Sequence, residues 1–208
     1  MQKESMAIFA DDVREMNERV IELSRSYAIF WMFCDIENCK RYSDVIRHHQ
    51  NFFDAIASSL FQGFCVITYQ LFDKRGDVKS LPELISYLTS LDQKLERRLK
   101  SSIDSQRPLL DNFFSFRHKI YAHRDKSKQP WEVFGNPSKI RIKSEMEAIV
   151  DLAQEIISAL AEAAGIEKNG FVENLRLRKK EAGDDASEVL EALDTKLASG
   201  LKPTNMQT

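Results

Sequence analysis

An arginine and two histidines lie close together in one short segment of this sequence. Arg117 and His118 are adjacent, and His123 follows Arg117 after five intervening residues. An imidazole titrates near about pH 6.5, so it can accept or release a proton under physiological conditions. A guanidinium carries a permanent positive charge on a planar fork of donors that suits phosphate and carboxylate groups. Together, these side chains could bind an anionic group and move a proton beside it.

The surroundings of Arg117 are unusual for a charged residue. At about 100° per residue on a helix, five apolar or aromatic side chains lie within about 60° of it. They are Leu110, Phe113, Phe114, Ile120 and Tyr121. A buried guanidinium costs free energy unless it is paired or reaches water. Arg117 therefore either reaches a rim, pairs with a carboxylate in the core, or has a functional role within this stripe.

The segment 116–125 reads FRHKIYAHRD and resembles the RNA-cleaving motif of the HEPN superfamily. That motif has an Arg, often followed by a polar residue, and then a His after a short gap. The Arg-polar-Lys start and the Ala-His-x-Asp finish are most similar to the abortive-infection, AbiU-type branch. His118 stands where an Asn is commoner in that motif. The resemblance implies an all-α fold, an antiparallel helical bundle with long helices.

This resemblance also implies metal-independent cleavage of RNA, in which the ribose 2′-hydroxyl attacks its own phosphate. His123 would be the general base or acid, and Arg117 would neutralise charge that builds on the phosphoryl oxygens. His118 would orient His123 or the substrate. The predicted catalytic residues are therefore Arg117, His123 and His118, with no cofactor and no metal. The expected system is of a defence or toxin-antitoxin type.

One helix alone does not bring Arg117 and His123 together. Six residues of helical rise separate them by about 9 Å, and their directions differ by about 120°. The resemblance implies a homodimer whose two motif helices line a shared cleft. The apolar stripe around Arg117 would then be the seam between the two copies.

Other interpretations stay open at this point. A HEPN-like bundle without catalysis could serve as a dimeric binding module, and a helical protein could match the motif by chance. A metal site made of Cys34, Cys39, His48 and His49 is not expected, because Cys-x4-Cys followed by adjacent histidines is not a recognised spacing. RNA is the expected substrate, and an antitoxin of nucleotidyltransferase type is a possible partner.

Helical periodicity in the rest of the chain indicates the elements that position this segment. Apolar residues first recur at intervals of three and four, at Met6, Phe9, Val13, Met16, Val20, Leu23, Tyr27 and Phe30. Such a seam packs against another long helix, within the chain or across a dimer. A second stripe predicts a single long helix over 42–72, with Gly63 at a close approach of another helix.

Capping signals divide the later part of the chain. Ser80 followed three residues later by Glu83 predicts a helix start, and so does Ser144 with Glu147. Gly165 predicts the end of the last core helix. We therefore predict a helical HEPN-like domain over 1–165. Residues 166–208 are charged and are predicted to form a partly disordered or partner-docking tail, with one amphipathic helix around Leu190.

The overall charge argues against a protein that coats long nucleic acid. The formal net charge is −2 and the sequence pI is about 6.1, so any contact with RNA must be local. The three cysteines form an odd set, and the chain does not start with a secretory pattern, so reduced thiols in the cytoplasm are expected. The most apolar stretches are short and carry polar residues, so no membrane role is expected.

Overall fold

The computed structural model describes residues 2–75, 78–122 and 142–200, and the regular elements in this part of the chain are all helices. The first four are α1 (Gln2–Cys34), α2 (Ile36–Arg41), α3 (Ser43–His48) and α4 (Gln50–Phe72). They are followed by α5 (Leu81–Tyr87), a 3₁₀ turn (Leu88–Ser90), α6 (Gln93–Ser105), α7 (Arg107–Ala122), α9 (Ile142–Ala163) and α10 (Lys168–Gly200). The predicted all-α fold is confirmed.

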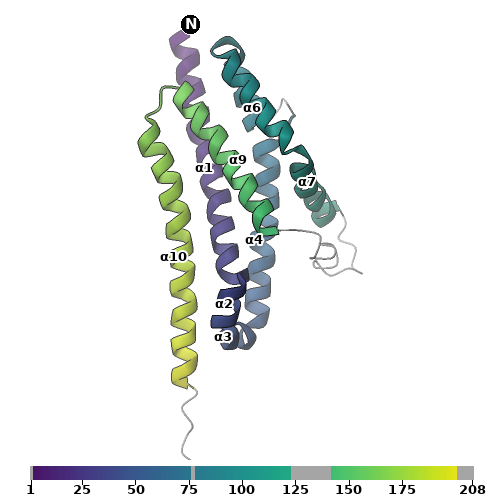
Figure 1. The fold of residues 1–208 in the computed structure, drawn as a ribbon, viewed down its shortest axis with the longest axis vertical. Coiled ribbons are helices and arrows are strands. Elements are labelled where there is room, and N and C mark those ends of the chain that lie inside the picture. Colours follow the sequence, from purple (N-terminus) through teal and green to yellow (C-terminus); the bar gives the residue numbers. More distant parts are fainter. Residues whose placement is uncertain (1, 76–77, 123–141, 201–208) are drawn as a thin grey trace, which may run out of the picture.

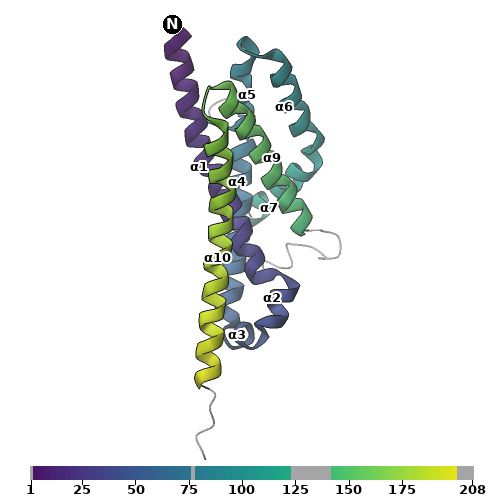
Figure 2. The ribbon, with the colours of Figure 1, turned by 60° about the vertical axis from the view of Figure 1, so that its left-hand side comes forward.

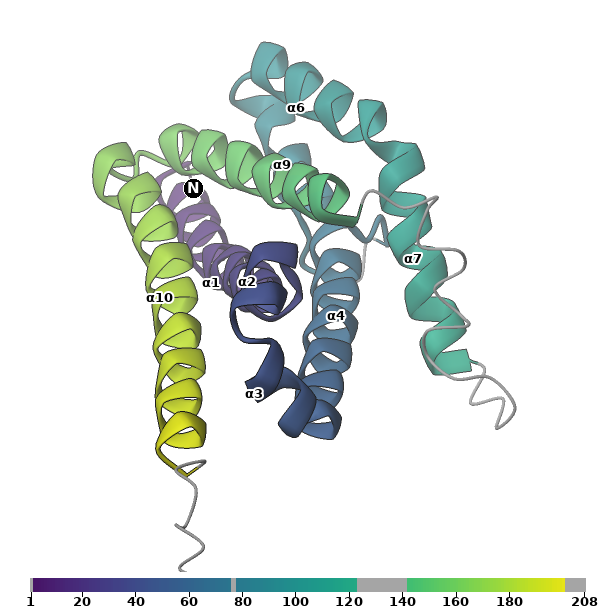
Figure 3. The same ribbon diagram turned by 60° about the horizontal axis from the view of Figure 1, so that its bottom comes forward.

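The long helices form an elongated bundle around α1. Helices α1 and α10 run down the view of Figure 1, whereas α4 and α9 run up it, so α1 is antiparallel to α4 and α9. Figure 2 shows α10 lying along α1, with α2 and α3 at the lower end of the bundle. Viewed from below, α7 lies beside α4, and α10 lies on the opposite side of the molecule (Figure 3).

The apolar seam predicted at the start of the chain forms the centre of the core. Val13, Val20 and Leu23 are completely buried, and α1 packs against α4, α9 and α10 of the same chain. Helices of the chain itself therefore cover this seam. Of the two alternatives for it, the structure shows packing within the chain.

The helix predicted over 42–72 is interrupted. Helix α3 ends at His48, and α4 begins at Gln50 after a non-helical backbone at His49 (φ −113°, ψ 31°). The break lets Tyr42 and Val45 pack against Phe53 in a small second cluster that includes Leu190 of α10. The predicted close approach at Gly63 is wrong, because a side chain added there would meet nothing within 4 Å.

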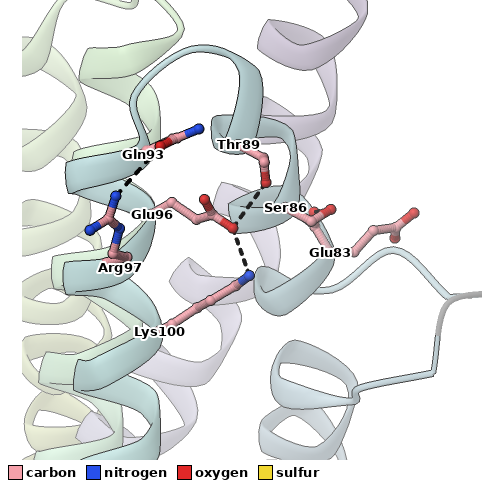
Figure 4. A network of polar contacts seen from close by, with 7 residues as sticks. All are labelled: Glu83, Ser86, Thr89, Gln93, Glu96, Arg97 and Lys100. Atoms are coloured by element: carbon pink, nitrogen blue, oxygen red, sulfur yellow. Dashed lines mark hydrogen bonds and ion pairs between the residues drawn. The ribbon is translucent and has the colours of Figure 1, made fainter.

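The connection from α4 to α6 is held by polar contacts. Ser80 caps α5 as predicted, since its hydroxyl accepts the Glu83 backbone N–H at 3.4 Å. The largely buried Glu96 of α6 accepts hydrogen bonds from Thr89 at 2.9 Å and from Lys100 at 2.6 Å (Figure 4). These contacts tie the 3₁₀ turn to α6, which leads directly into α7.

The predicted end of α9 at Gly165 agrees with the structure, whereas its predicted start at Ser144 does not. Gly165 has a left-handed backbone (φ 71°), and the Ile166 N–H reaches back to the Ala161 carbonyl at 2.9 Å, so the predicted C cap is confirmed. At the other end α9 already includes Ile142. Ser144 therefore lies inside its first turn, and the predicted cap at that residue is wrong.

Residues 168–200 differ from the predicted tail. They form the continuous helix α10, which packs along α1 and also contacts α9. Its buried face consists of Leu175, Ala182, Ala186 and Leu190. Their spacings of four and seven residues return them to one side of the helix. The division of the chain at residue 165 remains a prediction, and residues 201–208 lie outside the described part.

One helix in the described residues, α4, is long and apolar enough to cross a membrane by length and composition. Its apolar side chains also have a place in the core of the bundle. Phe64, Cys65, Leu71 and Phe72 are completely buried there. The composition of α4 is therefore accounted for by its position between α1 and α7.

Candidate functional site

Helix α7 is fixed to α4 by aromatic packing. Leu110 and Phe113 are buried, and the Phe113 ring lies 5.5 Å from that of Phe64 and 6.2 Å from that of Phe61 on α4. Phe116 adds an edge contact with Phe61 at 5.9 Å. The described part of the predicted apolar stripe therefore faces α4. The interpretation of this stripe as a dimer seam is wrong for Leu110 and Phe113, because their own chain covers them.

Arg117 lies one turn further along this same stripe and stacks on an aromatic ring. Its guanidinium carbon lies 3.9 Å from the centre of the Tyr69 ring, which belongs to α4. Both side chains are half-buried. Among the residues that the structure describes, no carboxylate forms an ion pair with Arg117. A cation over a ring face is attracted by the ring quadrupole, which offsets part of its desolvation cost.

Tyr69 is itself held from two sides. The Phe114 ring of α7 meets it edge-on, with centroids 5.2 Å apart and planes at 74°. The Arg75 guanidinium also lies over this ring, with its carbon 5.9 Å from the ring centre. Phe114 and Arg117 are three residues apart, so one face of α7 presents both to the same ring.

Asp73 follows the last residue of α4 and is only 6% exposed. Its carboxylate accepts the Arg75 side chain at 2.7 Å and the Arg75 backbone N–H at 3.1 Å. Burial alone would raise the pKa of Asp73, but the hydrogen bonds from Arg75 and Tyr69 outweigh it and lower the pKa below its usual value. Asp73 is therefore a buried carboxylate whose charge is paired with Arg75.

The structure places one of the three predicted catalytic side chains. Arg117 is described above. His118 belongs to α7, but the placement of its side chain is not described. His123 lies outside the described residues, which resume at Ile142. The shared cleft predicted for Arg117 and His123 therefore stays a prediction.

Comparison with known families assigns this chain. A family model described as AbiU2, of HEPN type, matches residues 10–182. The chain belongs to the AbiU2 family of HEPN domains. The family assignment predicted from residues 116–125 is thus confirmed. Comparisons with curated proteins and with solved structures gave no match.

The AbiU2 match extends well beyond the motif. It begins in α1 and runs to residue 182, in the middle of α10, so it includes Tyr69, Asp73 and Arg117. It also continues past residue 165, where we expected the HEPN-like domain to end. The first half of α10 therefore falls within the matched AbiU2 region.

Four residues in the contacts around Tyr69 and Phe114 were not found by reasoning from the sequence: Tyr69, Asp73, Arg75 and Arg107. Arg107 lies over the Phe114 ring at 5.5 Å and pairs with Asp111 at 2.9 Å. The spacing of Tyr69 and Asp73 could have indicated an interaction along one helix face. Nothing in the sequence shows that this end of α4 lies against α7.

Of the three cysteines in this AbiU2 chain, Cys65 is buried, and Cys34 and Cys39 are partly buried. Burial raises the pKa of the Cys34 and Cys65 thiols to about 12, and it also raises the pKa of Cys39. A thiol must lose its proton to bind a metal or act as a nucleophile, so these side chains are poorly suited to either role. Within the described residues, no three His, Cys, Asp or Glu side chains are grouped so as to hold a metal ion.

Proposed function

We propose that this AbiU2 protein is a metal-independent endoribonuclease of a defence or toxin-antitoxin type system. The observation that supports this proposal best is the position of Arg117 and its lack of an ion-pair partner among the described residues. Its guanidinium is half-buried, has a defined position on the Tyr69 ring, and has no ion-pair partner among the described residues. It therefore combines a fixed position with a charge that a phosphate can still neutralise.

In the proposed reaction, the ribose 2′-hydroxyl attacks the adjacent phosphorus and the bond to the 5′-oxygen breaks. The products carry a 2′,3′-cyclic phosphate and a 5′-hydroxyl. His123 takes the proton of the 2′-hydroxyl or supplies one to the leaving oxygen. Arg117 stabilises the charge that develops on the phosphoryl oxygens, and His118 orients His123 or the substrate.

The active form is proposed to be a homodimer, because one motif helix does not join Arg117 with His123. The apolar seams do not support a dimer, since the α1 seam, and Leu110 and Phe113 of α7, are covered within the chain. The composite site is the argument that is left. We expect light scattering at micromolar concentration to give twice the 24.0 kDa mass of one chain. A mass of one chain would contradict the composite site.

The alternative is a HEPN domain that binds a partner without catalysis. The stack of Arg117 on Tyr69 also favours this alternative, because it gives the arginine a structural role. An antitoxin of nucleotidyltransferase type stays a prediction under either function. The integrity of RNA in cells that express the protein distinguishes an endoribonuclease from a binding module.

The test is expression of wild-type protein in growing cells, with total RNA followed by electrophoresis. We expect growth arrest and RNA fragmentation, both abolished in Arg117→Ala with His123→Ala. The matched control is Arg47→Ala with His48→Ala, which removes the same two residue types from exposed positions on α3. Intact RNA with the wild-type protein, or equal fragmentation with both double variants, would favour the binding module.

A further inference from the structure

We propose that Tyr69 is a positioning residue for Arg117 in RNA cleavage. This inference rests on the proposed endoribonuclease function. It adds a residue of α4 to a site that the motif confines to the segment 116–125.

Contacts with α7 fix the orientation of the Tyr69 ring. One face of it receives the guanidinium at 3.9 Å, and the Phe114 ring packs against it at 5.2 Å. The Arg75 guanidinium also lies over this ring, 5.9 Å from its centre. A ring that packs against a neighbouring helix in this way has little freedom to turn. The guanidinium on its face is restricted in the same way.

The two carboxylates of this region, Asp73 and Asp111, pair with arginines other than Arg117. The Asp73 carboxylate is bound by Arg75, whose side-chain nitrogens approach it at 2.7 Å. Asp111 pairs with Arg107 at 2.9 Å. Among the residues that the structure describes, Arg117 has a neutral ring as its partner and no carboxylate. A ring attracts the cation without cancelling its charge, so the charge and the N–H donors stay available for phosphate.

This arrangement serves the transition state more than the bound substrate. Charge on the phosphoryl oxygens grows as the 2′-oxygen attacks, and a donor already in place needs no reorganisation at that moment. Without the ring, Arg117 could still reach a bound phosphate but would adopt several rotamers. We therefore expect the loss to fall on kcat, with KM little changed.

The experiment compares Tyr69→Leu, which removes the ring, with Tyr69→Phe, which keeps the ring and removes only the hydroxyl. Cation–ring attraction predicts a fall in kcat of about 3- to 30-fold for Tyr69→Leu. Tyr69→Phe should recover most of that loss. The matched control is Tyr87→Leu on α5, a partly exposed tyrosine that contacts Phe9, and it should leave kcat unchanged.

A second readout does not depend on activity. The Arg117 Nε–H signal in a ¹H–¹⁵N spectrum, assigned with Arg117→Lys, should be shifted upfield by the ring current of Tyr69. The shift should disappear in Tyr69→Leu and persist in Tyr69→Phe. An unshifted signal in the wild-type protein would overturn the stack. A shifted signal with equal kcat in wild type and Tyr69→Leu would overturn the positioning role.

Failure of the proposed function gives a different pattern. Wild-type protein without RNA cleavage would reject the endoribonuclease and, with it, the catalytic role of Tyr69. The arginine signal would still show whether the stack exists in solution. The two inferences can therefore be rejected separately.

Discussion

Alanine in place of His123 is expected to lower the rate of RNA cleavage by about 10²–10⁴-fold, because it removes the proposed proton-transfer group. Alanine in place of Arg117 should cost a comparable factor, about 10²–10³-fold, by removing charge stabilisation from the transition state. Arg117→Lys should recover only part of this loss, since an ammonium lacks the planar fork and stacks less well on Tyr69. Initial rates on a labelled RNA oligonucleotide measure all three effects.

Stability separates a catalytic role of Arg117 from a structural one. An arginine in an apolar stripe can be replaced with little cost, but here the stack on Tyr69 contributes roughly 0.5–1 kcal/mol. We therefore expect Arg117→Ala to unfold within a few degrees of wild type while its activity is lost. If Arg117→Ala were unfolded under the assay conditions, its loss of activity would reflect a structural role of Arg117 and would not support a catalytic one. A folded variant with the wild-type rate would reject the site.

Truncation after Gly165 is expected to destabilise the protein strongly. Leu175 and Leu190 of α10 are almost fully buried, and burial of such side chains contributes about 1.5–3 kcal/mol each. Their loss alone is a large share of the roughly 5–15 kcal/mol that stabilises a typical domain. Removal of α10 also exposes the faces of α1 and α9 that it covers. Urea unfolding followed by circular dichroism should show a much lower midpoint or no cooperative transition.

Truncation after Gly200 is the matched control, because it removes only residues that follow α10 and should leave the midpoint unchanged. Leu190→Ala gives a milder test, with an expected cost of about 2–5 kcal/mol. Equal midpoints for wild type and for the chain that ends at Gly165 would show that α10 is an appendage, as its charged sequence first suggested.

The helices and their buried faces could be predicted because they depend on local periodicity. The seam at Val13, Val20 and Leu23 is buried as expected, and Gly165 ends α9. The break at His49 was missed because the apolar stripe continues across it, although the backbone does not. An apolar stripe shows which side chains face the core, but it does not show whether the helix that carries them is continuous.

The character of α10 was misjudged for a different reason. Many of its residues are charged, 13 of 33, and two of its four most buried residues are Ala182 and Ala186. Small side chains contribute little to a hydrophobic pattern, yet they let two helices approach closely. Of the amphipathic residues expected near its end, Leu190 is buried, whereas Val189 is 48% exposed. A seam built partly from alanine is hard to recognise from sequence.

The candidate site could be located from the sequence but not assembled. The motif indicates Arg117, and its position on an apolar stripe was the sign that it needed a special partner. That partner, Tyr69, lies 48 residues earlier in the chain. No local pattern links the end of α4 to α7, because their contact depends on how the α5–α6 connection returns the chain. Tertiary structure was needed to find it.

Analysis of the RNA ends made by the purified protein in the presence of EDTA tests the central claim most directly. A uniform RNA oligonucleotide is incubated with the wild-type protein, and the fragments are weighed by mass spectrometry. The proposed mechanism predicts cleavage that EDTA does not affect, with 2′,3′-cyclic phosphate and 5′-hydroxyl ends, and none with His123→Ala. Fragments with 5′-phosphate ends, or cleavage that stops with EDTA, would contradict it, because these are the marks of a metal-dependent nuclease.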